Sequence, residues 1–141
     1  MSKLEVTIEL IFHATESLEK FFQSFNEMFG LKEDVFSISN VKGHFENPIT
    51  VLRAKFTKKD AIQFLEKFLT RLTEAQKKEI IQEINERTEN STLHIRFDKQ
   101  EFIQGKVILV EKEAIKLKIH TPIYNKKDTV KVFTEILQNI N

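Results

Sequence analysis

The 141-residue chain has no cysteine and no tryptophan, and it has only three glycines and two prolines. The absence of cysteine excludes disulfides, a thiol nucleophile and cysteine-based metal sites, and it fits a reducing compartment. With glycine only at Gly30, Gly43 and Gly105, there is no glycine-rich phosphate loop. These absences remove several common classes of enzyme from consideration.

The chain also lacks a charge excess and a long apolar run. The formal net charge is +1, so a nucleic-acid site would have to be local, made by placing Lys and Arg on one face. No apolar stretch approaches the roughly 20 residues that a membrane-spanning helix needs, and Met1–Glu9 does not resemble a signal peptide. We therefore expect a cytoplasmic protein without a membrane partner. With 40% hydrophobic and 30% charged residues, residues 1–141 are expected to form a single domain.

Apolar and polar residues alternate in several segments, which is typical of strands with one buried face. The predicted strands are residues 4–12, 35–40, 49–56, 92–97, 106–111 and 114–121. Pro122 should end the last of them.

Other segments have apolar residues at spacings of three and four, which indicates amphipathic helices. The first, at 16–29, should be capped by Thr15 and stopped by Gly30. A second runs from 59 to 72, and Thr73-Glu74-Ala75-Gln76 forms a capping box for a third. A single turn should follow Asp98, and Asp128 or Thr129 should cap a final helix. The order β-α-β-β-α-α-β-β-β-α predicts an α+β fold, a mostly antiparallel sheet with helices on one face.

The candidates for catalysis or metal binding are weak. The four histidines have no short metal-ligand spacing, and no cofactor is expected. A site built from His13, His44 and Asp98 is conceivable, and a nuclease using clustered acids or histidines stays open as an alternative. We expect a non-enzymatic protein.

The outward positions of the predicted strands are richer in information, because nearly all of them in the later strands are basic. They are Arg53, Lys55, His94, Arg96, Lys116, Lys118 and His120. A positive sheet surface suits a phosphate backbone, because Lys and Arg displace condensed counterions on binding. The alternative is a solvated face whose cations pair with Glu5, Glu9 or Glu113.

The densest group of unusual residues is Lys42-Gly43-His44-Phe45-Glu46-Asn47-Pro48-Ile49. Glycine and proline constrain this segment at its two ends. Between them, Phe45 could stack on an unpaired base.

Three segments together resemble an archaeal family described as a predicted exosome subunit with an RNA-binding domain. They are Phe12-His13-Ala14-Thr15-Glu16 with Glu19-Lys20, then Gly43-His44-Phe45-Glu46-Asn47-Pro48-Ile49, then Leu93-His94-Ile95-Arg96-Phe97-Asp98-Lys99-Gln100. They occur in the family's order along nearly the whole chain. The family is similar in fold to the large-subunit ribosomal protein that binds five-S ribosomal RNA, which implies a ribosomal-protein-like α+β domain.

The resemblance implies RNA binding in RNA processing or degradation, with RNA and exosome or other processing proteins as partners. The residues that carry it over are His13, Thr15, Gly43, His44, Asn47, Pro48, Arg96, Asp98, Lys99 and Gln100. At Glu46 the family pattern has glycine, so a close approach of this backbone to phosphate is not implied. A second interpretation is a protein-interaction or homodimerising subunit, which the outward apolar residues Ile11 and Val51 favour. Thr15, Asn47 and Asp98 could also serve only to stabilise turns and helix ends.

Overall fold

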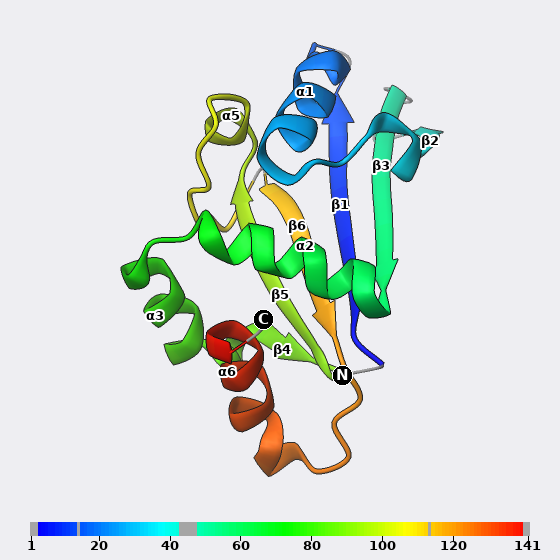
Figure 1. The fold of residues 1–141 in the computed structure, drawn as a ribbon. Helices are drawn as coiled ribbons and strands as arrows, with labels where there is room; N and C mark the ends of the chain where they lie inside the picture. Colours follow the sequence, from blue (N-terminus) through cyan, green and yellow to red (C-terminus); the bar gives the residue numbers. More distant parts are fainter. Residues whose placement is uncertain (1–2, 14, 43–47, 113, 140–141) are drawn as a thin grey trace. The chain divides into compact units, whose positions relative to one another are not determined.

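The computed structural model describes residues 3–13, 15–42, 48–112 and 114–139. Six strands form one antiparallel sheet in the order β2-β3-β1-β6-β5-β4, with helices packed on it (Figure 1). The predicted α+β class is therefore confirmed. The chain divides into two compact units, and four strands contribute residues to both. Unit 1 is 1–6, 56–95 and 117–141, and unit 2 is 7–55 and 96–116. In the described part of the chain, no helix is long and apolar enough to cross a membrane.

The central strands are β1 (Glu5–His13), β3 (Pro48–Thr57), β5 (Thr92–Asp98) and β6 (Ala114–His120). Burial alternates along β5 and β6 and along most of β1, and in β3 it alternates from Val51 onward, so that one face is buried and the other is half-buried or exposed. This is the pattern that the sequence predicted, and it follows from the period of two in a pleated strand. The partly wet second face is where a ligand could reach the sheet.

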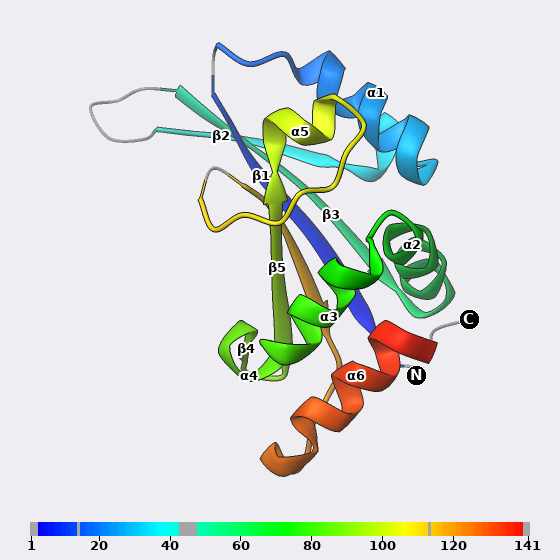
Figure 2. The same ribbon diagram turned by 90° about the vertical axis from the view of Figure 1, so that its left-hand side faces the viewer.

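Unit 2 is built around a cluster of phenylalanines. Helix α1 (Leu18–Phe29) and the short α5 (Lys99–Ile103) lie side by side (Figures 1 and 2). Phe25 and Phe102 join them, with ring centroids 4.7 Å apart, and both rings are fully buried. Phe97 of β5 meets Phe102 edge-on at 5.5 Å. These rings cover the buried face of the unit's strands, which leaves the opposite face open.

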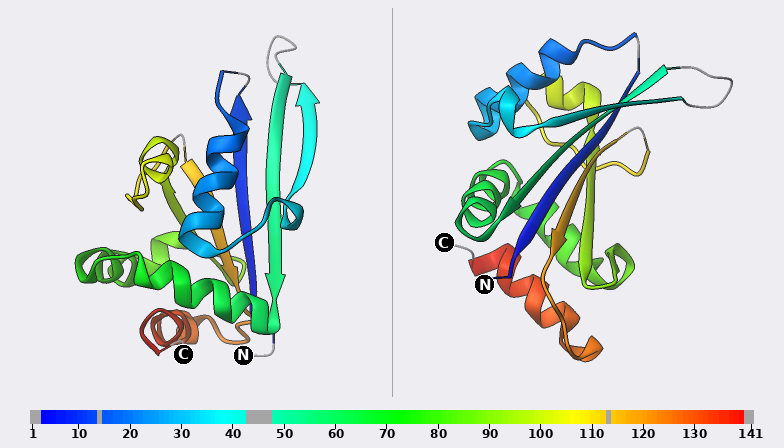
Figure 3. Two further views of the ribbon diagram at one scale, coloured as in Figure 1. Left: turned by 45° about the horizontal axis from the view of Figure 1, so that its top comes forward. Right: turned by 90° about the vertical axis from the view of Figure 1, so that its right-hand side faces the viewer.

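A β-hairpin lies at one edge of unit 2. Strand β2 (Ser37–Lys42) pairs antiparallel with β3 and follows a 3-10 turn at Glu33–Val35 (Figure 3). All six residues of β2 are exposed. The predicted strand at 35–40 is therefore shifted by two residues toward the C-terminus.

Unit 1 contains α2 (Lys58–Thr70), α3 (Glu74–Gln82), α4 (Ile84–Arg87), β4 (Thr88–Glu89) and α6 (Thr129–Asn139). A 3-10 turn, η3 (Lys126–Asp128), leads into α6. The capping box predicted at Thr73 is present, with Gln76 as its second member. Helix α6 packs against α3 and α4 (Figure 2).

Three local predictions need correction. Ser17 caps α1 in place of Thr15, and the helix begins two residues later than expected. The third helix is broken at Glu83, whose ψ of 15° departs from helical geometry. The final helix begins at Thr129, within the predicted start, and η3 with its cap Asn125 precedes it. Gly30 does end α1 as predicted, in a left-handed conformation with φ of 67°.

The third correction concerns the predicted strand 106–111. Only a bridge between Phe97 and Leu109 forms there. Two backbone hydrogen bonds support it: the N–H of Asp98 donates to the carbonyl oxygen of Ile108, and the N–H of Val110 donates to that of Arg96. Ile108 is exposed while the next two residues are half-buried, so the alternation fails. Too few rungs remain to make a regular strand.

Candidate nucleic-acid interface

The open face of the sheet in unit 2 carries four basic side chains, which we call the basic face. They are Arg53 and Lys55 of β3, Arg96 of β5 and Lys116 of β6. Arg53 and Lys55 are exposed, whereas Arg96 and Lys116 are half-buried. All four stand at outward positions, where alternation requires them to point away from the phenylalanine core. The sequence predicted this placement.

Part of the basic face interacts with other groups of the protein, and Lys55 is among the residues with such a partner. Arg53 reaches Glu9 of β1 at 4.0 Å, and the Arg53 side chain remains 57% exposed. An ion pair at that distance and exposure contributes little to stability. Among the described residues, no group forms a hydrogen bond or ion pair with the side chain of Arg96 or of Lys116. As far as the described residues are concerned, these two cations are available to an anionic ligand.

A groove of about 300 Å³ lies on the same open face. Three neighbouring strands line it: Glu9, Ile11 and His13 from β1, Ile49 from β3, and Ala114 and Lys116 from β6. Ile11 is 40% exposed, so a ligand in the groove can reach its side chain. The groove thus combines an apolar wall with one carboxylate and one ammonium group. Its volume is at the lower end of the range for small-ligand sites, roughly 300–1,000 Å³.

Lys99 also lines the groove, but its ammonium group is committed to the protein. Lys99 is only 4% exposed. Its Nζ donates to the carbonyl oxygen of Ile11 at 2.8 Å and to Glu16 Oε1 at 3.0 Å. Glu16 Oε1 also accepts from the backbone N–H of His13 at 2.8 Å. The burial leaves Lys99 unable to contact a phosphate without breaking these bonds, so we correct its assignment from RNA contact to positioning residue.

This Lys99–Glu16 pair links two of the three segments that carried the family resemblance. The segment after β1 supplies Glu16, and the start of α5 supplies Lys99. The third segment contributes Ile49 to the same groove. The remainder of that segment lies outside the described residues: Gly43, His44, Phe45, Glu46 and Asn47.

The other motif residues have varied surroundings. His13 lines the groove and is exposed, as are Thr15, Pro48 and Gln100. Pro48 is the first residue of β3, which is a position that tolerates its missing N–H. Asp98 accepts from the backbone N–H of Glu101 at 2.8 Å and so caps α5. Its carboxylate therefore has a structural role that the sequence had left open.

The remaining predicted basic residues belong to unit 1. His94 of β5 and Lys118 and His120 of β6 are half-buried at outward positions. His120 Nδ1 lies 3.0 Å from the hydroxyl oxygen of Thr92, within hydrogen-bond distance. We treat these residues apart from the basic face of unit 2.

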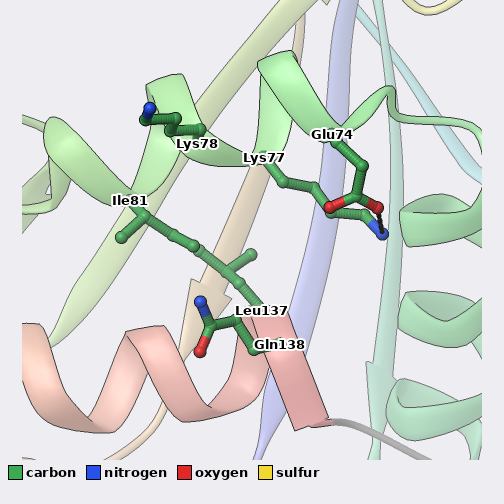
Figure 4. Close-up of a pocket in the computed structure, with 6 residues that line it drawn as sticks. All are labelled: Glu74, Lys77, Lys78, Ile81, Leu137 and Gln138. Atoms are coloured by element: carbon green, nitrogen blue, oxygen red, sulfur yellow. Dashed lines mark hydrogen bonds and ion pairs between the residues drawn. The ribbon is translucent and has the colours of Figure 1, made fainter.

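Unit 1 has a groove of its own, of about 290 Å³, between α3 and α6 (Figure 4). Lys77 and Lys78 line it together with Ile81 and Leu137, and Lys77 pairs with Glu74 at 3.4 Å. None of the predicted site residues lies here. In the part of the chain that the structure describes, no group of three His, Asp or Glu side chains could hold a metal ion.

Sequence reasoning missed the role of Glu16, which was named only as part of the first segment of the resemblance. It did name Glu9 as a possible ion-pair partner of the outward cations, and Glu9 pairs with Arg53 in the structure. The single signal for Glu16 was its occurrence with Lys99 in two segments of the same resemblance. No local pattern connects residues separated by 83 positions.

The fold and site define an α+β protein whose sheet has a basic open face. The RNA-binding family matches residues 5–121, and the chain belongs to that family. Over 142 aligned residues it is 30% identical to the RNA-binding protein PAB1135 of Pyrococcus abyssi, covering 94% of this chain and 92% of that protein.

Solved structures agree with this assignment. AF2318 from Archaeglobus fulgidus, described as a DUF54 protein, is 28% identical with a TM-score of 0.81, covering 94% of this chain and 97% of its own. Mth689 from Methanothermobacter thermautotrophicus, also a DUF54 protein, is 27% identical with a TM-score of 0.71, covering 95% and 97%. A UPF0201 protein from Methanococcus jannaschii shares the fold at 15% identity, with a TM-score of 0.62 over 97% of this chain and 95% of that one.

Proposed function

We propose that this chain is a non-enzymatic RNA-binding protein, accessory to RNA processing or degradation, that contacts phosphates through the basic face of unit 2. The observation that carries the proposal is the placement of Arg53, Arg96 and Lys116 on one face of the sheet, where Lys116 also lines a groove. Lys and Arg that neutralise phosphates release counterions, which supplies affinity without reading sequence. A chain with net charge +1 can bind RNA in this way only where its cations are segregated.

The experiment is a charge reversal with a matched control. Arg96→Glu/Lys116→Glu reverses two charges on the basic face. Lys59→Glu/Lys131→Glu makes the same change in net charge on exposed positions of α2 and α6. At low salt, the first variant should lose at least about tenfold in RNA affinity, because phosphate contacts dominate binding. The second should lose much less. Equal losses, or no binding by the unmodified protein, would contradict the proposal.

A second candidate is a homodimer, for which edge strand β2 is the observation. Ile38 and Val41 are 48% and 47% exposed on this edge, and an unpaired strand edge is a template for pairing with another chain. In such a dimer, β2 of a second copy of the chain would pair along this edge. Light scattering should then give twice the chain's 16.6 kDa, and Val41→Lys should restore the monomer. A monomer at all concentrations would remove this candidate.

Association with the exosome, absence of catalysis and a cytoplasmic location remain predictions of the sequence and its resemblance. For a nuclease, His13, His44 and Asp98 would have to converge. The hydrogen bond from Glu101 already engages the Asp98 carboxylate, and His44 lies outside the described residues. The proposal therefore assigns no catalytic role to these three residues.

A further inference from the structure

The groove in unit 2 contains a carboxylate beside the cations of the basic face. Glu9 lines the groove, and its side chain is 22% exposed. It pairs with Arg53 at 4.0 Å, and the pair leaves both side chains partly exposed. A carboxylate in this groove repels a phosphate but can accept a hydrogen bond from an amino group of a ligand.

The wall of the groove is mostly apolar. Ile11 is 40% exposed at an outward strand position, and Ile49 and Ala114 are half-buried beside it. Covering such apolar surface with a flat apolar ligand is favourable, because water is then released from both surfaces. Phosphate and ribose cannot supply that cover, whereas the face of a nucleobase can.

We propose that this groove holds one unpaired nucleobase that carries an exocyclic amino group, with Glu9 as the acceptor for that group. The proposal rests on the proposed RNA-binding function and narrows its substrate class to RNA with an unpaired cytosine, adenine or guanine, the bases that carry such a group. Carboxylates accept from the N4 amino group of cytosine. Lys116, at the rim, then meets the adjoining phosphate.

Base pairing would prevent this mode of binding. In an A-form duplex the bases are stacked, and their major-groove edges lie in a deep and narrow groove that side chains do not reach. A base can lie on Ile11 and Ile49 only when it is unstacked. The substrate is therefore single-stranded RNA, or a loop or bulge within a folded RNA.

Cytosine and uracil provide the test, because they differ at position 4 by an amino group against a carbonyl oxygen. Fluorescence anisotropy with nine-nucleotide oligo-C and oligo-U at one salt concentration measures the two affinities. We expect oligo-C to bind about tenfold more tightly, in line with the discrimination that a well-placed base contact gives. Uracil should bind more weakly because its O4 carbonyl oxygen would face the Glu9 carboxylate, and neither group can donate a hydrogen bond to the other.

Glu9→Gln is the matched variant. An amide can accept from cytosine or donate to uracil, so the variant should bind oligo-C and oligo-U with similar affinity. Glu5→Gln removes the same charge from β1 at a residue outside the groove and should retain the preference for oligo-C. A ratio near one in the unmodified protein, or an unchanged ratio in Glu9→Gln, would overturn the inference.

The two proposals fail in different ways. If both oligonucleotides bind equally, and Arg96→Glu/Lys116→Glu still weakens binding, the phosphate-binding function stands and the base site is rejected. If only duplex RNA binds, the base site is again rejected. If no RNA binds at low salt, both proposals fail.

Discussion

At the scale of single residues, the buried ion pair of Lys99 and Glu16 supports one part of the groove lining, which Lys99 itself contributes. Their side chains are 5% and 13% exposed, so both charges are largely removed from water. A buried pair of this kind gives little net stability, but an unpaired member is costly. The pair therefore fixes how the segment after β1 meets α5.

Lys99→Met should lower the free energy of unfolding by about 3–5 kcal/mol, because it leaves the Glu16 carboxylate buried without its cation. Urea unfolding measures this. Lys20→Met, at an exposed position of α1, is the control and should stay within roughly 0.5 kcal/mol.

The double variant Glu16→Gln/Lys99→Met tests the coupling. Glutamine keeps an acceptor for the N–H of His13 while removing the second charge. We expect part of the stability to be recovered, with a coupling energy of about 0.5–3 kcal/mol. Strictly additive effects would show that the two side chains act independently.

At the scale of elements, the sequence was informative where a pattern is local. Alternation placed β1, β5 and β6 with the correct buried faces, and Thr73 and Asp98 marked two helix starts. The strand predicted at 106–111 was wrong because alternating residues do not show whether a partner strand supplies enough rungs. Lys99 was misassigned because its partners, Ile11 and Glu16, are distant in sequence.

The cap of α5 yields a prediction at this scale. Asp98→Ala should cost about 1 kcal/mol of stability, because the N–H of Glu101 loses its acceptor at 2.8 Å. Asp98→Asn should cost much less. Gln100→Ala in the same helix, where the side chain is exposed, should leave the urea midpoint nearly unchanged. Similar destabilisation in Asp98→Ala and Gln100→Ala would contradict the capping role.

At the scale of the whole molecule, function depends on segregated charge. The net charge of +1 gives no sign of the four cations on the basic face, because acidic residues elsewhere in the chain offset their charge. Strand alternation was sufficient to predict Arg53, Lys55, Arg96 and Lys116 on one side. It could not predict the groove beside them, because that depends on which strands are neighbours and on the small side chain of Ala114.

The central claim is that the basic face of unit 2 contacts RNA phosphates, and the salt dependence of binding tests it most directly. Each phosphate that a protein neutralises adds about 0.7 to the magnitude of the slope of log affinity against log salt for a single strand, and about 0.9 for a duplex. We predict that Arg96→Glu/Lys116→Glu reduces the magnitude of this slope by roughly 1.4–1.8, whereas Lys59→Glu/Lys131→Glu leaves it unchanged. An identical slope in the unmodified protein and in Arg96→Glu/Lys116→Glu would contradict the account.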